Sequence, residues 1–504
     1  MKAVPALSPA KGCTEFHSGG ILGLGNMIVP LTTVAEVLGF GEPVCDRLVK
    51  GCSIDSRRIE PGQLFFAIRG QRHNGHDYVA SALEQGAAGA VVERLYRDQS
   101  PPAVRTQLIP VADTTKALQT LARHVRRQWG GRVVAVTGSM GKTTTKEMIA
   151  ALLATRFRVL KSQGNLNNHY GLPLTLLGLE PSHEIAVVEL AMSAPGEIAC
   201  LAQIAVPDVG VVTNVAPVHL EFFDSVDSIG RAKRELVENL GSLNGKPVAV
   251  LNFDDDRVRK FAEGFDGKVV TYGLKEGAIF RGTKVRSYER GSRFFLSAPG
   301  FADGFSVPMP GTHNIENALA ALAAASVCGL DLGTLGSALE NFRNVSQRSE
   351  TFTMPGNITV LNDCYNSNPR AMECMIETLA GWTGALRRIV VAGEMLELGP
   401  TSPEWHRKIG RKVVECGIDS LVAVRGDARF IREGALEAGM APGNAVFFPS
   451  VQEAAHYCGN LLKPGDVVLV KGSRGVNLER VRELLAKSFG CPTDVSRKVP
   501  QRMG

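Results

Sequence analysis

The chain has 504 residues, enough for about three domains of roughly 150 residues each. Its hydrophobic content of 44% and charged content of 21% are typical of a globular protein, and no apolar run reaches the roughly 18 residues that a membrane helix needs. The net charge of +6 is small, and no Lys/Arg block is interleaved with aromatic residues, which argues against a nucleic-acid partner.

Residues 1–26 carry prolines and glycines that interrupt every periodicity, together with no continuous apolar core and no convincing cleavage site. They predict a disordered extension rather than a signal peptide. Residues 489–504 predict a loose tail. The ten cysteines form no CxxC pair, and Cys200, Cys328 and Cys374 stand in apolar settings. We interpret them as buried thiols of a reducing compartment, which indicates a cytoplasmic protein.

Residues 27–113 predict a small mixed α/β domain, with strands at 63–69 and 88–93 and a helix at 78–84. Asp55, Ser56 and Arg57 precede a Pro-Gly turn. The Ser56 hydroxyl and the Arg57 guanidinium could bind a phosphate or a uracil. The same residues could equally form a capped turn.

Residues 114–346 predict a central domain in which strands alternate with helices. The predicted strands are 133–137, 158–161, 185–190, 209–215 and 247–252. Their near-continuous apolar character favours a parallel sheet covered on both faces. Residues 347–488 repeat the alternation, with strands at 358–363, 388–392, 420–425, 446–449 and 467–471, and predict a separate doubly wound domain. The fold class is therefore α/β with three domains.

A glycine loop joins the first central strand to a helix predicted to reach about residue 157. It reads Gly138-Ser139-Met140-Gly141-Lys142-Thr143-Thr144. Such a loop presents backbone N–H groups and a helix N-terminus to a phosphate. Lys142 can reach the terminal phosphates of a nucleotide, and Thr143 can ligate Mg²⁺. The first glycine comes later than the usual spacing requires, and the alternative is a tight turn that happens to carry Lys-Thr.

Other polar residues follow strands of the central domain, at the edge where ligands bind in open parallel sheets. Glu189 is a candidate Mg²⁺ ligand or an ion-paired glutamate. His219 could ligate a metal, orient a phosphate or be structural. Lys233 belongs to a charged helical stretch that by itself indicates a solvated face.

Amide-rich segments add further candidates that the sequence alone leaves open. Asn165, Asn167 and Asn168 could hold a turn or a substrate amide. Asn317 could read an adenine edge, whereas Asn314 could cap its helix.

The last domain carries three polar clusters at predicted strand ends. They comprise Asp363 with Tyr365, Asn366 and Asn368, the run 393–399 (Gly-Glu-Met-Leu-Glu-Leu-Gly), and Lys471 with Arg474. The first cluster suits ribose, phosphate or a peptide. Lys471 and Arg474 together indicate an anion grip.

Taken together, these segments resemble the Mur ligases over residues 27–487. The run Tyr365-Asn-Ser-Asn-Pro369 is similar to that of the dipeptide-adding branch, and the Asp-Asn-Pro-Arg signature of the third-residue-adding branch is absent. The resemblance implies an ATP-dependent amide ligase that adds D-alanyl-D-alanine to UDP-N-acetylmuramoyl-tripeptide through an acyl phosphate. It also implies a cytoplasmic role in peptidoglycan synthesis, cell-wall biogenesis, cell shape and cell division, ATP and Mg²⁺ as cofactors, and a monomer without a membrane span.

The resemblance also implies roles for individual residues. The phosphate loop, Gly138, Ser139, Gly141, Lys142, Thr143 and Thr144, would hold ATP. Glu189, His219 and a carbamylated Lys233 would serve the metals. Asn317, Arg348 and Asp363 would surround the nucleotide. Ser56 and Arg57 would bind the uridine diphosphate, and the remaining candidate amides and cations (Asn165, Asn167, Asn168, Tyr365, Asn366, Asn368, Lys471 and Arg474) would bind substrates.

Three residues depart from the family pattern: Ala194 in place of histidine, His169 in place of an acidic residue, and Gln347 in place of glycine. They keep two alternatives open. One is another ligase of this type, either third-residue-adding or folylpolyglutamate-like. The other is a nucleotide-binding paralogue without ligase activity.

Overall fold

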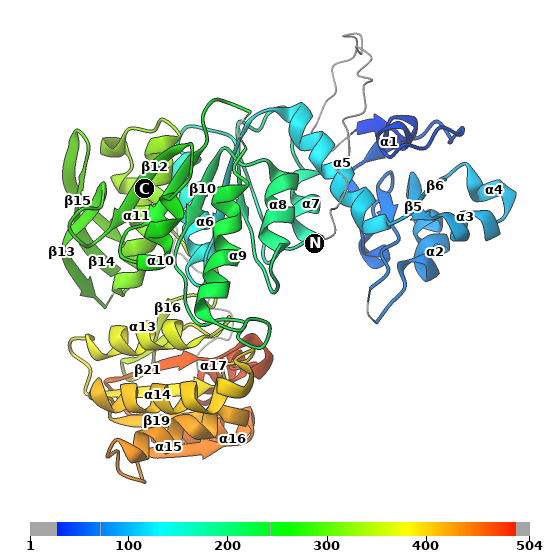
Figure 1. The fold of residues 1–504 in the computed structure, drawn as a ribbon. Helices are drawn as coiled ribbons and strands as arrows, with labels where there is room; N and C mark the ends of the chain where they lie inside the picture. The colour runs from blue at the N-terminus through cyan, green and yellow to red at the C-terminus, as the bar shows by residue number, and fades with distance from the viewer. Residues whose placement is uncertain (1–27, 71, 242, 290, 490–504) are drawn as a thin grey trace, which may run out of the picture.

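The computed structural model describes residues 28–70, 72–241, 243–289 and 291–489 (Figure 1). The predicted extension at 1–26 and nearly all of the predicted tail lie outside these residues. No helix in the described part of the chain is long and apolar enough to cross a membrane.

The N-terminal region contains two small sheets. Strand β1 (Ile28–Pro30) pairs antiparallel with β2 (Leu48–Lys50), and four parallel strands follow in the order β3-β4-β5-β6. The bounds of these strands are Cys52–Ser53, Leu64–Phe66, Gly89–Glu93 and Leu108–Val111. The helices are α1 (Leu31–Val37), α2 (Val79–Glu84), α3 (Arg94–Gln99) and α4 (Pro102–Arg105). The predicted strands at 63–69 and 88–93 and the helix at 78–84 are therefore present, the first strand in a shorter form.

Helix α5 (Thr114–Trp129) joins this region to the central sheet (Figure 1). The Asp113 carboxylate caps it by accepting from two backbone N–H groups, and Gly130 ends it with a left-handed φ of +70°. Arg126, fully buried, pairs with Asp208 at 3.1 Å and donates to the carbonyls of Ala205 and Val206. A single apolar core runs from α1 through α5 into the central sheet, so α5 packs against both the N-terminal region and the central domain.

The central sheet has nine strands in the order β15-β14-β13-β12-β11-β10-β7-β9-β8. Its bounds are β7 (Arg132–Thr137), β8 (Val159–Lys161), β9 (Ile185–Glu189), β10 (Val209–Val212), β11 (Val248–Asn252), β12 (Lys268–Gly273), β13 (Phe280–Tyr288), β14 (Gly291–Ala298) and β15 (Phe301–Val307). The five predicted strands are β7 to β11, and they are parallel as expected.

Strands β12 to β15 extend this sheet beyond the predicted part, with β13, β14 and β15 antiparallel. Buried and exposed residues alternate along β13 and β14 because one face meets solvent. Strands β13 and β14 therefore lack the continuous apolar runs that mark the parallel strands β7 to β11. The described residues of this domain also form the helices α6 (Lys142–Leu153), α7 (Gly171–Leu176), α8 (Glu197–Ala205), α9 (Val226–Glu238), α10 (Asp256–Arg259) and α11 (Thr312–Val327). A short α12 (Gly336–Glu340) follows.

The last sheet has six strands in the order β16-β17-β21-β18-β19-β20. Its bounds are β16 (Glu350–Met354), β17 (Ile358–Asn362), β18 (Arg387–Gly393), β19 (Ser420–Val424), β20 (Ala445–Phe448) and β21 (Asp466–Lys471). All five predicted strands are present and parallel, and the antiparallel β16 is additional. The helices are α13 (Pro369–Ala380), α14 (Ser402–Glu415), α15 (Arg429–Glu437), α16 (Val451–Leu461) and α17 (Glu479–Ser488).

The cysteine interpretation needs one correction. Cys328 and Cys374 are buried as expected, but Cys200 is exposed. It lies on α8, whose buried residues are Ile198, Leu201, Ala202, Ile204 and Ala205. Position 200 therefore faces outward although its sequence neighbours are apolar.

Candidate functional site

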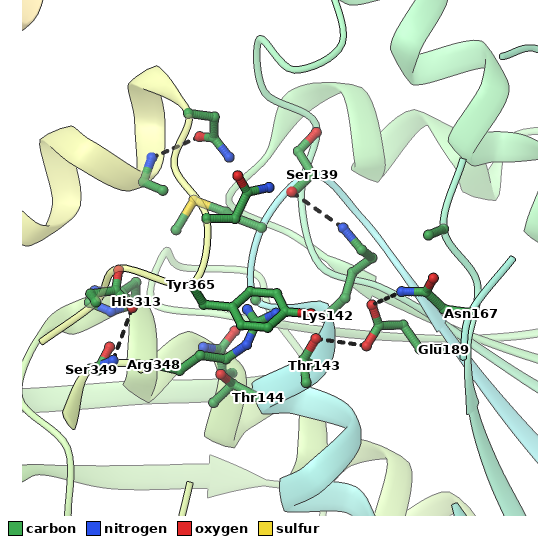
Figure 2. Close-up of a pocket in the computed structure, with 18 of the residues that line it drawn as sticks. Ser139, Lys142, Thr143, Thr144, Asn167, Glu189, His313, Arg348, Ser349 and Tyr365 are labelled. Carbon is green, nitrogen blue, oxygen red and sulfur yellow. Dashed lines mark hydrogen bonds between the residues drawn. The ribbon is translucent and has the colours of Figure 1, made fainter. Parts of the chain in front are cut away.

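The central and last domains enclose a cavity of about 250 Å³ over the carboxyl ends of β7 and β9 (Figure 2). Its walls come from the phosphate loop, the end of β9, the start of α11, the loop that follows β17 and the end of β21. Most of the candidate residues of the central and last domains line this cavity, although they come from segments that lie far apart in the sequence.

The phosphate loop forms the floor of this cavity. Gly138 has a φ of +147°, and an added Cβ would lie 1.8 Å from Thr213 Oγ1, so the loop can approach β10 only with glycine there. Asn214 braces the loop, because its side-chain oxygen accepts the N–H of Met140 at 3.0 Å and its carbonyl accepts the N–H of Ser139 at 2.9 Å. The strand, loop and helix arrangement predicted from sequence is thus present, although α6 ends at Leu153 rather than near 157.

Lys142 begins α6 and curls back over the loop. Its Nζ donates to the Gly138 carbonyl at 2.9 Å and lies 3.5 Å from the Ser139 carbonyl. Burial lowers the pKa of Lys142, the Glu189 carboxylate opposes that shift, and the nearby Arg348 charge adds to it. Two cations therefore converge on one small cavity, which is the electrostatic setting that a polyphosphate requires.

Glu189 ends β9 beside the loop and is buried. One carboxylate oxygen accepts the Thr143 hydroxyl at 2.7 Å, and the other accepts the Asn167 amide at 2.8 Å (Figure 2). A hydroxyl and a carboxylate held side by side at a phosphate loop are hard oxygen donors of the kind that Mg²⁺ shares with nucleotide phosphates. The ion-paired alternative for Glu189 is not what the structure shows, since both its partners are neutral.

His219 lies at the mouth of the cavity with a left-handed φ of +55°. Its Nδ1 faces Glu397 of the last domain at 2.5 Å. This contact lowers the pKa of Glu397. No group of three or more His, Cys, Asp or Glu side chains in the described part of the chain could hold a metal alone. A metal here would therefore need oxygen atoms from a bound phosphate as well.

Lys233 corrects the interpretation of its segment as a solvated face. It is 2% exposed, on the inward side of α9. Burial lowers its pKa well below the usual value, and the positive charge of Lys142 lowers it further. The two lysines are therefore near enough for their charges to repel, although Lys233 does not line the cavity.

The start of α11 forms one side wall. Asn317 is buried and its Oδ1 accepts the Thr145 hydroxyl at 3.2 Å, beneath Gly141. Asn314 does not cap the helix, because Gly311 holds the capping position and the Asn314 amide donates to the Pro310 carbonyl instead. Burial lowers the pKa of His313, on the same wall, to about 4.

The opposite wall belongs to the last domain. The Arg348 guanidinium lies 4.1 Å from the centre of the Tyr365 ring, and its Nε is buried without a partner among the described residues. Two left-handed residues, Gln347 (φ +65°) and Ser349 (φ +46°), flank it and set its direction. An aromatic ring, a cation and an orphaned donor at one cavity wall fit a flat, hydrogen-bonding ligand.

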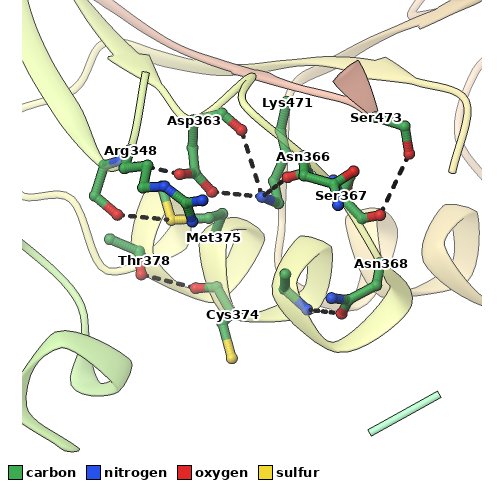
Figure 3. A network of polar contacts seen from close by, with 12 residues as sticks. Arg348, Asp363, Asn366, Ser367, Asn368, Cys374, Met375, Thr378, Lys471 and Ser473 are labelled. Atoms are coloured by element: carbon green, nitrogen blue, oxygen red, sulfur yellow. Dashed lines mark hydrogen bonds and ion pairs between the residues drawn. The ribbon is translucent and has the colours of Figure 1, made fainter. Parts of the chain in front are cut away.

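A polar network behind this wall involves Lys471 (Figure 3). Lys471 is buried, forms an ion pair with Asp363 and donates to the Asn366 carbonyl at 3.1 Å. Asp363 also accepts the N–H of Ser349 at 2.9 Å, which ties the linker to the sheet. Arg474 NH1 reaches the Tyr365 hydroxyl at 3.3 Å. Lys471 thus already has a carboxylate partner within the protein. It does not form with Arg474 the expected pair of free cations that would bind an anion.

Several candidates lie elsewhere or have local roles. Ser56 and Arg57 belong to a 3-10 turn in the N-terminal region, where Asp55 caps the turn and pairs with the exposed Arg57. The Asn168 side-chain oxygen accepts the N–H of Gly171 at the start of α7, and Asn368 caps α13 by accepting the N–H of Ala371. The carbonyl of Asn165 accepts the N–H of Asn167 at 2.8 Å, and Asn165 is not among the residues that line the cavity.

The structure also adds cavity residues that the sequence analysis did not select, among them Ser193, Ser349 and Met375. Serine and methionine occur throughout the chain, and nothing in their immediate sequence marks these three.

Comparison with known protein families identifies the domains of the chain. The models of three Mur ligase domains match residues 48–126 (Mur ligase family, catalytic domain), 136–325 (Mur ligase middle domain) and 347–474 (Mur ligase, glutamate ligase domain). The chain belongs to the Mur ligase family.

Among similar family members, the UDP-N-acetylmuramoyl-tripeptide–D-alanyl-D-alanine ligase of Bacillus subtilis is 33% identical over 88% of this chain and 94% of its own length. The enzyme of the same name from Escherichia coli is also 33% identical, over 92% and 99%. A crystal structure of MurF from Acinetobacter baumannii superposes with a TM-score of 0.82 at 30% identity, covering 91% of this chain and 99% of that one.

MurF of Thermotoga maritima, solved in complex with ADP, has a TM-score of 0.77 at 30% identity, covering 87% and 98%. A folylpolyglutamate synthase of Mycobacterium tuberculosis reaches a TM-score of 0.60 at 17% identity over 74% of this chain and 93% of that one. That likeness shows the shared fold alone.

Proposed function

We propose that this Mur ligase joins the terminal carboxylate of UDP-N-acetylmuramoyl-tripeptide to the amine of D-alanyl-D-alanine, with ATP as the energy source, in cytoplasmic peptidoglycan synthesis. The observation that carries the proposal is the cavity in which Lys142, Thr143 and Glu189 of the central domain face Arg348 of the last domain. Relatives named for this activity match about nine-tenths of the chain.

The cavity supports ATP as the nucleotide. The loop N–H groups and the α6 N-terminus suit the phosphates, and Lys142 is placed to contact the outermost of them. Asn317 and Asp363 line the sides, while Tyr365 and the unpartnered Nε of Arg348 offer a stacking face and a donor for the base or ribose.

The donor set also fits Mg²⁺. Thr143, Glu189 and His219 would hold it together with phosphate oxygens, and bound Mg²⁺ supplies charge neutralisation between two anionic reactants. A carbamylated Lys233 would add a further oxygen ligand. The lowered pKa of Lys233 favours this modification, since a neutral amine attacks the carbon of CO₂ and releases one proton to water.

The proposed chemistry has two steps. A carboxylate oxygen of the tripeptide attacks the terminal phosphorus of ATP, the bond to the bridging oxygen breaks, and ADP leaves from an acyl phosphate. The dipeptide amine then attacks the acyl carbon, loses a proton, and expels inorganic phosphate. Lys142 offsets the negative charge that builds up when the carboxylate approaches the phosphate, and so reduces their repulsion.

The uridine diphosphate end of the substrate is assigned to the N-terminal region, where Ser56 and the exposed Arg57 lie on one turn. The dipeptide is assigned to the last domain, near Asn366 and Arg474. All of these residues come from one chain, so the proposal needs only a monomer. The three domains are proposed to end near residues 113, 346 and 488.

A ligation assay with a substrate panel tests the proposal. We expect ATP-dependent product with UDP-N-acetylmuramoyl-tripeptide and D-alanyl-D-alanine, and none with UDP-N-acetylmuramoyl-dipeptide plus a diamino acid or with folate plus glutamate. Product from either of the last two pairs would assign the chain to another branch. ATP binding without product from any pair would favour a non-catalytic paralogue, for which Ala194 and Gln347 are the motivating residues.

A further inference from the structure

Two loops that are far apart in sequence meet where the central domain faces the last domain. One follows β10 and carries His219 to Glu221, and the other follows β18 and carries Glu397 to Gly399. Figure 1 shows the loop before α9 extending toward the last domain. His219 Nδ1 lies 2.5 Å from Glu397 Oε2, and the N–H of Glu221 donates to the Glu397 carbonyl at 3.2 Å.

Backbone geometry and packing show that this contact is built into the fold. His219 and Glu397 both have left-handed φ angles, +55° and +64°. Gly399 lies so close to Glu221 that an added Cβ would stand 3.2 Å from the Glu221 Cα. Leu220, between the two contacts, packs against the apolar cores of both domains. The two loops are therefore joined by side-chain, backbone and apolar contacts at one place.

The contact has a chemical consequence for the His219 ring. A carboxylate can only accept a hydrogen bond, so Nδ1 carries a hydrogen in this contact, and in a neutral ring Nε2 is then the nitrogen with the free lone pair. His219 lines the cavity, whereas Glu397 does not belong to its lining. Histidine ligands of metals commonly donate their other ring N–H to a carboxylate, which fixes both tautomer and orientation.

We propose that Glu397 is a positioning residue that couples docking of the last domain to assembly of the nucleotide site through His219. The inference rests on the proposed function, which assigns His219 to the metal–nucleotide site. When the last domain is docked, Glu397 orients the ring toward the cavity. When it is not docked, His219 loses its only described carboxylate partner, and the site is incomplete.

A double-mutant cycle on metal binding tests this coupling without requiring turnover. The probe is Mn²⁺ in the presence of a non-hydrolysable ATP analogue, followed by the electron paramagnetic resonance signal of free Mn²⁺. We expect Glu397→Ala to weaken Mn²⁺ binding about tenfold, the lower end for such partners because half of the Glu397 side chain is exposed. Glu397→Gln keeps an acceptor and should recover part of the loss. Glu483→Ala, an exposed glutamate on α17, is the matched control and should match the unmutated protein.

The decisive comparison is between His219→Ala and the double variant His219→Ala/Glu397→Ala. If Glu397 acts through His219, the double variant binds Mn²⁺ no more weakly than His219→Ala alone. Losses that add in full, or an unchanged affinity in Glu397→Ala, would overturn the proposal. A lower unfolding temperature with unchanged Mn²⁺ affinity would show a structural role only. Absence of ligation by the unmutated protein would refute the proposed function. The Mn²⁺ affinities of the variants could still be measured and compared in that case.

Discussion

Gly141 is the position at which one added methyl group should most disturb the phosphate loop. Its φ is +80°, and a Cβ there would stand 2.3 Å from Oδ1 of Asn317. The left-handed conformation costs a non-glycine residue about 1–2 kcal/mol. Displacing Asn317 from its hydrogen bond with Thr145 adds about 1 kcal/mol. We therefore expect Gly141→Ala to lower the free energy of unfolding by about 2–3 kcal/mol and to weaken nucleotide binding.

Gly196 provides the matched control, because it also caps a helix and has a nearly equal φ of +84°, with nothing within 4 Å of an added Cβ. Gly196→Ala should show only the conformational cost of about 1–2 kcal/mol and normal nucleotide binding. Urea unfolding and calorimetric titration with a non-hydrolysable ATP analogue measure the two effects. Equal destabilisation in both variants, or unchanged nucleotide affinity in Gly141→Ala, would refute the reasoning.

Three further predictions follow from single side chains. Lys142→Ala should abolish ligation while the thermal unfolding midpoint stays within a few degrees; near-normal ligation would remove Lys142 from the mechanism. Burial and the charge of Asp254 raise the pKa of Glu316 from 4.5 to about 7. As pH rises from about 4.5 to 7, the unfolded chain therefore loses the Glu316 proton before the folded protein does, which favours unfolding. Over this range the unmutated protein should lose stability relative to Glu316→Gln, by at most on the order of 3 kcal/mol. Parallel pH dependences, measured by urea unfolding, would contradict this. Gln347→Gly should raise the free energy of unfolding by about 1 kcal/mol, because glycine tolerates the left-handed φ that Gln347 adopts; a loss of stability would show that the glutamine side chain matters more than the backbone.

Local sequence patterns predicted those strands and helices whose own residues carry a clear apolar pattern. The parallel strands are buried on both faces, so their apolar runs stand out, and the glycine loop marks the end of β7, where the cavity lies. The antiparallel β13 to β15 have one solvated face, and their alternation is broken by a bulge between Thr283 and Arg286. An alternation pattern sought over a few residues therefore does not detect such strands.

The candidate site was predictable to the extent that topology gathers strand ends at one edge. That argument brought Lys142 and Glu189 together but could not show that Lys233 turns inward from a charged helix. It could not pair Glu397 with His219, which lies 178 positions earlier in the chain, because the contact depends on how two domains dock. Nor could it show that Lys471 forms an ion pair with Asp363.

Transfer of labelled oxygen tests the central claim most directly. The terminal carboxylate of UDP-N-acetylmuramoyl-tripeptide is labelled with ¹⁸O, and the inorganic phosphate released in the presence of ATP and D-alanyl-D-alanine is analysed by mass spectrometry. An acyl phosphate predicts that the phosphate carries one labelled oxygen from the substrate, and that Lys142→Ala releases none. Unlabelled phosphate, or release that does not depend on the dipeptide, would contradict the account.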